Sequence, residues 1–175
     1  MGATPKYALR YPEPADPADV PTDMHELATD VEAALQSKGP GAELAYTQIT
    51  ASVNITGTTE AGATAIISSG AFAVDGSTPI LIEFYTQAAL TPAGQSLILW
   101  LLGPGGSLGR LAFIPAATGL TEGGPVRVAR RLTPAAGNPN YTISGQVSAG
   151  TGVVSAGPGG AGNDGPAFIR VIRAA

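Results

Sequence analysis

The sequence offers few side chains that could act as a catalytic base or nucleophile. His25 is the only histidine and cysteine is absent. A Ser-His-Asp arrangement would therefore depend on His25, and no thiolate could act as a nucleophile or a metal ligand. His25 falls in the first turn of an expected helix, outside the β-rich part of the chain. We expect a surface or packing role for it.

The carboxylates of the β-rich part are widely spaced. Glycosidases place two carboxylates beside one cleft, whereas Asp75 and Asp164 each adjoin a glycine in an expected turn. Glu83 alternates within an apolar run, where it is expected to be exposed or ion-paired. Asn163 and Asp164 are too few oxygen ligands for a calcium loop. We therefore expect no catalytic site, no metal site and no cofactor.

A glycine-rich stretch, Gly157–Gly162, formally matches the dinucleotide-binding pattern G-x-G-x-x-G. That pattern requires a helix to follow, so that the helix N-terminus meets the pyrophosphate. Asn163-Asp164-Gly165-Pro166 follows instead. We interpret the stretch as a loop before the last strand.

Three arginines, Arg127, Arg130 and Arg131, form the only basic cluster of the sequence. Such a cluster could bind an acidic glycan or another anion, with Tyr141 as a further contact. The alternative is an exposed strand face, or ion pairs with an acidic neighbour. Trp100, Tyr85 and Tyr141 could also stack on sugars, but as strand residues they are expected to pack in a core or an interface.

Composition favours a turn-rich β protein. Of 175 residues, 44% are hydrophobic and 13% charged, with 24 glycines and 15 prolines. The net charge of −4 argues against a nucleic-acid-binding protein, which needs clustered cations. No apolar run approaches the roughly 20 residues of a membrane span, and the N-terminus lacks the apolar stretch of a signal peptide. We expect a protein made in the cytoplasm.

The N-terminal residues 1–40 are expected to form an attachment segment. Residues 1–43 carry three basic and eight acidic side chains, while the rest of the chain carries six and five. Prolines 12, 14 and 17 predict an extended strap. A helix with Thr22 as N-cap should follow and end at Gly39-Pro40. Its apolar residues recur at three- and four-residue steps and need a surface to pack on: Met24, Leu27, Ala28, Val31, Ala34 and Leu35.

Residues 41–175 are expected to form an all-β head, a jelly-roll-like antiparallel β-sandwich. Short β-rich runs alternate with Gly-, Pro- and Asn-rich turns, and no helical pattern intervenes. The predicted strands are Ala45–Thr56, Thr64–Ser68, Ala71–Val74, Pro79–Tyr85, Ser96–Leu102, Arg110–Ile114, Val126–Leu132, Asn140–Val147 and Ala167–Arg173.

Two of these strands are apolar on both faces. The run Ser96–Leu102 shows no alternation, and in the last strand Phe168 and Ile172 flank Arg170 on the face opposite Ile169 and Val171. A strand with two apolar faces is covered on both. We expect a neighbouring subunit, or else a loop, to cover the second face. The predicted subunit interface consists of Trp100, Leu102, Phe168, Arg170 and Ile172.

The N-terminal stretch resembles a known group of proteins. Tyr7–Pro12, Asp16–Met24, Leu27-Ala28 and Val31-Glu32 resemble the start of tail and fibre proteins of tailed bacteriophages with GC-rich genomes. The remainder is similar to the β heads of phage fibres and to TNF/C1q-like trimeric jelly rolls, with Pro166–Ile172 similar to their last strand. The resemblance implies a virion component attached through Tyr7, Leu9, Tyr11, Met24, Leu27, Val31 and Leu35.

These observations favour a structural, non-enzymatic function. The first hypothesis is a short homotrimeric fibre or minor tail protein, anchored to other virion proteins by its N-terminus, with a host surface glycan as a further partner. The second is a capsid decoration or head-fibre protein. A third, of another class, is a carbohydrate-binding module. No nucleic-acid or membrane partner is expected.

Overall fold

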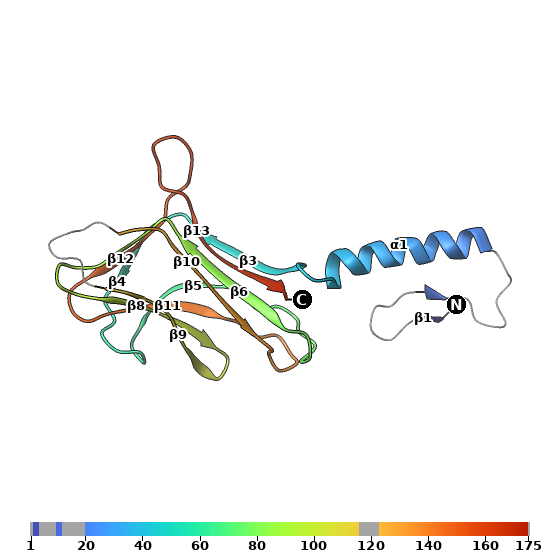
Figure 1. Cartoon of the computed structure of the whole chain (residues 1–175), viewed down its shortest axis with the longest axis horizontal. Coiled ribbons are helices and arrows are strands. Elements are labelled where there is room, and N and C mark those ends of the chain that lie inside the picture. Colours follow the sequence, from blue (N-terminus) through green and yellow to red (C-terminus); the bar gives the residue numbers. More distant parts are fainter. Residues whose placement is uncertain (1, 4–9, 12–19, 116–122, 175) are drawn as a thin grey trace.

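The computed structural model describes residues 2–3, 10–11, 20–115 and 123–174. Within them, one helix precedes an all-β domain and projects from one end of it (Figure 1). Helix α1 (Val20–Lys38) begins before the predicted N-cap, Thr22, which places Pro21 in the first turn, where its missing N–H costs no hydrogen bond. The helix ends before Gly39, as predicted; the Gly39 N–H donates to the Leu35 carbonyl at 3.2 Å.

Two short strands accompany the helix. β1 (Gly2–Ala3) pairs antiparallel with β2 (Arg10–Tyr11), and β2 lies beside α1. In the part of the chain that the structure describes, no helix has the length and apolar character needed to cross a membrane.

Two four-stranded antiparallel sheets form the head. The first has the order β10–β6–β13–β3 and the second β5–β11–β8–β9. A smaller three-stranded sheet, β4–β12–β7, lies at the end of the head far from α1 (Figure 1). Their bounds are β3 (Glu43–Ile49), β4 (Val53–Ile55), β5 (Thr64–Ser68), β6 (Ile80–Thr86), β7 (Ala88–Leu90), β8 (Leu97–Gly103), β9 (Gly106–Ile114), β10 (Val126–Leu132), β11 (Thr142–Val147), β12 (Gly152–Ser155) and β13 (Ala167–Arg173).

The strand pairing confirms the predicted jelly-roll-like sandwich. The eight long strands pair as nested partners: β3 with β13, β5 with β11, β6 with β10, and β8 with β9. A long antiparallel ribbon folded over itself produces this nesting and distributes the pairs between two sheets. The fold is therefore all-β, with the N-terminal helix as its one described helical element.

The core lies between the two four-stranded sheets. Leu97, Leu99 and Leu101 of β8 are completely buried, whereas Ile98, Trp100 and Leu102 are half-buried on the outer face. The sequence of β8 does not alternate, but its burial does, because successive side chains of a strand point to opposite faces. Each sheet consequently has an outer face that the core does not use.

Some predicted strands were wrong. Ala71–Val74 forms no strand and contributes one isolated bridge, Val74 with Gly137. The predicted strand Ala45–Thr56 is divided into β3 and β4 by a bend. Strands β7 and β12 were missed because they are short and contain Ala and Gly, residues with weak strand preference.

Both ends of the head lie at one pole of the sandwich, which we call the base. The Gly41 N–H donates to the Arg173 carbonyl at 2.8 Å, and the Arg173 N–H donates to the Ala42 carbonyl at 2.9 Å. The residues before β3 therefore pair with the end of β13, and α1 joins the head at this pole (Figure 1).

Candidate functional site

The outer face of the β10–β6–β13–β3 sheet carries a row of aromatic rings. Phe168 of β13 lies between Tyr46 of β3 and Tyr85 of β6, with ring centroids 5.6 Å apart on each side and interplanar angles of 29°. The three residues come from three adjacent strands, and Phe168 is directly opposite Tyr85 in register. Tyr46 is 47% exposed. This row, the aromatic face, gives the sheet an apolar outer surface.

An ion-pair network adjoins the aromatic face. The carboxylate of Glu83, whose side chain is 10% exposed, accepts hydrogen bonds from Arg170 Nε at 3.0 Å and from Arg127 Nη2 at 3.1 Å. The hydrogen bond from Arg170 is the main reason that the pKa of Glu83 lies below its ordinary value. The same bond raises the pKa of Arg170. Of the two alternatives expected for Glu83, exposed or ion-paired, the structure shows the ion pair.

The outer face of the second sheet carries a different cluster. The Arg110 guanidinium lies 5.7 Å from the ring centroids of both Trp100 and Phe113, within cation–π distance. The indole N–H of Trp100 donates to Gln146 Oε1 at 3.0 Å. Phe113 is 53% exposed. Sequence analysis missed Arg110 and Phe113, which become neighbours of Trp100 only through the pairing of β9 with β8.

The five predicted interface residues are divided between these two faces. Phe168, Arg170 and Ile172 share the outer face of the first sheet, and Trp100 and Leu102 share that of the second. All five are half-buried within a single copy of the chain. They therefore belong to two separate surfaces on opposite sides of the sandwich.

The apolar stripe of α1 is exposed along its length. Met24 is 67% exposed, Leu27 42%, Val31 37% and Leu35 66%. In contrast, the acidic side chains Asp23, Glu26 and Asp30 of the same helix are half-buried. The stripe contacts neither the head nor another described element closely enough to be covered.

The other predicted attachment residues are described only in part. Tyr11 lies in β2, and Tyr7 and Leu9 fall outside the described residues. His25 is exposed, and its carbonyl accepts a hydrogen bond from the Thr29 hydroxyl at 2.9 Å, an interaction internal to the helix.

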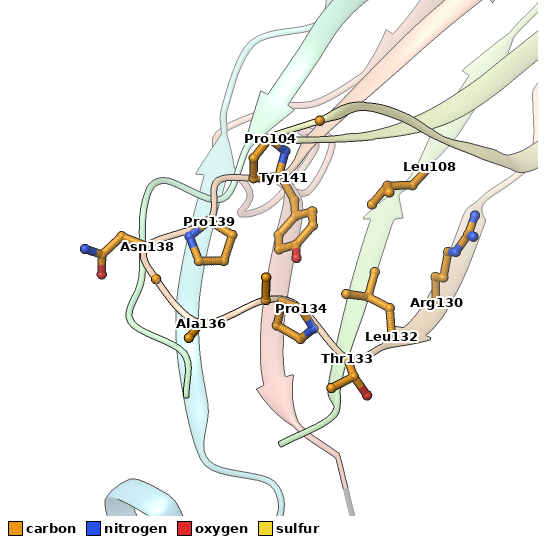
Figure 2. A pocket seen from close by; sticks show the side chains of 13 residues that line it. Pro104, Leu108, Arg130, Leu132, Thr133, Pro134, Ala136, Asn138, Pro139 and Tyr141 are labelled. Atoms are coloured by element: carbon orange, nitrogen blue, oxygen red, sulfur yellow. The ribbon is translucent and has the colours of Figure 1, made fainter. Parts of the chain in front are cut away.

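The arginine cluster is separated by the alternation of β10. Arg127 and Arg131 are exposed and opposite Tyr85 and Leu81 of β6, whereas Arg130 is half-buried and opposite Ile82. Of the predicted glycan or anion contacts, the structure therefore brings only Arg130 and Tyr141 together. They line the same pocket (Figure 2).

This pocket opens at the base of the head and has a volume of about 510 Å³. It lies between the turn that joins β8 to β9 and the connection from β10 to β11. We call it the base pocket. Its walls are mainly apolar, and its polar groups come from Arg130, Thr133, Asn138 and the hydroxyl of Tyr141. The other residues that line it are Pro104, Gly105, Leu108, Leu132, Pro134, Ala135, Ala136, Gly137 and Pro139. The prolines of this loop are visible in the sequence, but their grouping depends on tertiary structure.

The turn carboxylate of Asp75 has a structural role. Asp75 Oδ1 accepts hydrogen bonds from the backbone N–H groups of Ser77 and Thr78 at 2.8 and 2.7 Å, and Oδ2 accepts one from the Thr78 hydroxyl at 2.7 Å. These bonds hold the pKa of Asp75 far below its usual value, led by the bond from the Thr78 hydroxyl. The described residues contain no group of three or more His, Cys, Asp or Glu side chains that could hold a metal ion.

Comparison with known proteins gives likenesses of fold. No family model and no curated protein matches the sequence. Among solved structures, the chain is similar to the C-terminal CBM6 of LamC, a marine laminarinase from Zobellia galactanivorans, with 13% identity, a TM-score of 0.35, and 75% of this chain and 90% of that one covered.

Two further structures are similar. The carbohydrate-binding module CBM6cm-2 of lichenase 5A from Cellvibrio mixtus, in complex with cellotriose, shares 16% identity at a TM-score of 0.31, with 80% and 95% of the two chains covered. The Eiger TNF from S. frugiperda shares 10% identity at a TM-score of 0.32, with 71% and 92% covered. All three have β folds of this general kind, and the jelly-roll assignment here rests on the strand pairing itself.

Proposed function

We propose that the chain is a non-enzymatic assembly protein whose β head is carried by α1 and which forms a homotrimer. The observation that carries this proposal is the exposed stripe of α1. Met24, Leu27 and Val31 are separated by three and four residues, the spacing of a coiled-coil seam. An isolated helix of this length is marginally stable in water, so burial of the stripe against other copies would stabilise it.

The aromatic face supports assembly of the heads as well. Tyr46, Phe168 and Tyr85 form a continuous apolar row on a sheet surface that no described element covers. Aromatic residues are enriched in interfaces because they bury a large area with little loss of rotamer freedom. Contacts between heads through the aromatic face and between helices through the apolar stripe would both stabilise the same oligomer, because each chain carries both surfaces.

We infer further that the assembled protein is a virion component. This inference depends on the similarity of the N-terminal stretch to phage tail and fibre proteins, which includes Met24, Leu27 and Val31. In this proposal, the N-terminal strap and helix attach the protein to the particle as a short fibre or minor tail protein. A position on the capsid is the second possibility for the same arrangement.

Sedimentation of the full chain tests the assembly proposal. The wild-type protein should sediment with three times the mass of one chain at micromolar concentration. The double variant Leu27→Ser, Val31→Ser should dissociate because each serine removes an apolar contact from the seam, while the far-ultraviolet circular dichroism of the head is retained. The double variant His25→Ser, Glu32→Ser, at two exposed positions of the same helix, is the matched control and should stay assembled. A wild-type monomer would contradict the proposal.

Particle association tests the virion proposal separately. In a density gradient of the parent phage, the wild-type chain should migrate with the particles. Removal of residues 1–40 should leave a folded head that is lost from the particle fractions. A head that still migrates with the particles would show that the attachment surface lies elsewhere, even if the trimer forms.

A further inference from the structure

The base pocket contains a buried tyrosine whose hydroxyl has no protein partner among the described residues. Tyr141 is 2% exposed, and its ring packs against Phe72 at a centroid distance of 5.9 Å. Its backbone is fixed by two hydrogen bonds with Ser69, at 2.8 and 3.1 Å. Figure 2 shows the side chain extending into the pocket. The hydroxyl is not sealed from solvent: among the described residues, the fully buried side-chain polar atoms without a partner belong to Ser144 and Arg173. The Tyr141 hydroxyl is therefore open to the pocket, where a polar group of a ligand can bond to it.

The Tyr141 hydroxyl is available as a hydrogen-bond donor. Burial raises the pKa of Tyr141 above its ordinary value of 10.0. The group is therefore protonated at neutral pH, and it can donate one hydrogen bond and accept others.

Arg130 provides a positive charge on another wall of the pocket. No carboxylate among the described residues pairs with it, whereas Arg127 on the same strand pairs with Glu83. Its side chain lies close to Gly109, because a Cβ atom built on Gly109 would lie 3.2 Å from Nη1 of Arg130. The φ angle of Gly109, +114°, also favours glycine at this position. The guanidinium therefore lies close to the backbone of β9. A half-buried guanidinium of this kind suits an oxyanion.

The size and walls of the pocket suit a ring rather than a single ion. A volume of about 510 Å³ falls within the range of sites for small organic ligands. Pro104, Pro134 and Pro139 contribute apolar surface, and proline side chains add no donor. Thr133 and Asn138 add hydroxyl and amide groups at the rim. The combination is one cation, a few neutral polar groups and an apolar floor.

We propose that the base pocket binds an acidic saccharide, a pyranose ring that carries a carboxylate. The carboxylate pairs with the Arg130 guanidinium, a ring hydroxyl bonds to the Tyr141 hydroxyl, and the C–H face of the ring packs on the prolines. This ligand class satisfies both polar groups at once. A neutral sugar would leave Arg130 unpaired, and an apolar carboxylate would leave the Tyr141 hydroxyl unpaired. The inference does not depend on the trimer, because the residues involved lie on neither α1 nor the aromatic face.

Titration with three probes tests the ligand class. Glucuronic acid, glucose and benzoate are each titrated into the full-length protein at low ionic strength, where charge pairing is least screened, and binding is followed by heteronuclear NMR. Glucuronic acid should bind about tenfold more tightly than either other probe, as expected for one additional charge-assisted hydrogen bond. Benzoate binding as tight as that of glucuronic acid would overturn the saccharide assignment.

Two variants locate the binding in the base pocket. Tyr141→Phe should weaken glucuronic acid binding about fivefold, since one hydrogen bond is worth roughly 1 kcal/mol. It should leave the unfolding midpoint unchanged, because the hydroxyl has no partner in the described protein. Arg130→Gln should abolish the preference for glucuronic acid over glucose. The controls are Tyr46→Phe and Arg131→Gln, which lie outside the pocket and should bind as wild type. Unchanged binding in both pocket variants would refute the proposal.

Discussion

Arg170 of β13 faces Glu83 of β6 directly in register, and its Nε and Nη2 atoms both donate to Glu83 Oε2. Arg127 of β10 donates to the other carboxylate oxygen. One carboxylate therefore connects three adjacent strands on the outer face of the sheet. Because the Arg170 side chain is 38% exposed while that of Arg127 is 69% exposed, the bond to Arg170 is the better shielded of the two.

Replacement of Glu83 should destabilise the head. In Glu83→Gln the amide cannot satisfy both arginines, and its N–H₂ group opposes a guanidinium. We expect the free energy of unfolding to fall by about 1.5–3 kcal/mol, the range for hydrogen bonds to charged groups. Denaturation with guanidinium chloride measures the change. Glu60→Gln, at an exposed position, is the control and should be neutral; equal stability of both variants would contradict the role of the network.

The stability of the head should depend on pH on the acidic side. Glu83 and Asp75 both have pKa values below their ordinary values in the folded state. Such groups stabilise the fold above the unfolded-state pKa, and this contribution is lost as the pH falls through the folded-state pKa. We therefore expect a level free energy of unfolding near neutral pH and a decline below about pH 4.5.

Variants assign that decline to particular groups. Urea denaturation across an acidic pH series should show a shallower decline for Glu83→Gln and for Asp75→Asn than for the wild type. Each variant removes one group whose proton uptake is linked to unfolding. A decline of wild-type steepness in both variants would mean that other carboxylates control the acid transition.

The two faces of β8 should differ sharply in their contribution to stability. Leu99 is fully buried in the core, whereas Leu102 is half-buried on the outer face. Leu99→Ala should cost about 2–5 kcal/mol because it leaves a cavity. Leu102→Ala should cost less than about 1.5 kcal/mol, since less area is removed from water. Thermal and chemical unfolding of the two variants give the comparison. Equal losses would show that both faces of β8 are buried alike in the folded protein.

A glycine of β11 is required by packing. A Cβ at Gly145 would lie 2.9–3.1 Å from three side-chain carbons of Ile55, which is fully buried. Gly145→Ala should therefore destabilise the head by about 1–3 kcal/mol through overpacking. Gly105→Ala is the control because nothing lies within 4 Å of its Cβ position. A neutral Gly145→Ala variant would mean that Ile55 can move aside freely.

The period-two pattern made part of the fold predictable. In β13 the alternation of Ile169 and Val171 with Phe168 and Arg170 identified the core face and the outer face, and both are confirmed. The sequence of β8 is apolar throughout, so the period-two pattern does not distinguish its two faces, and it is the structure that shows Leu99 buried in the core. The same alternation places Arg130 on the face of β10 opposite that of Arg127 and Arg131. The sequence-based prediction nevertheless treated the three arginines as one cluster.

The pairing partners could not be predicted in the same way. Trp100 and Arg110 meet because β8 and β9 pair with two register shifts, and such irregularities have no simple sequence signal. The base pocket depends on a loop, Thr133–Tyr141, whose position is set by contacts distant in sequence, such as Phe72 with Pro139. The exposed stripe of α1 was predictable because it depends on local spacing alone.

The adjacency of the Gly41 and Arg173 backbones also has a practical consequence for display. The chain enters the head at Gly41 and leaves β13 at Arg173, at the same pole, so a tag joined behind β13 would extend from the same side as the helix. The turn between β12 and β13 projects from the sandwich elsewhere (Figure 1), and its stem is closed by hydrogen bonds from Gly157 to Gly165 and from Gly159 to Asp164. A foreign epitope grafted between Gly160 and Asn163 would thus be carried clear of both the helix and the sheets.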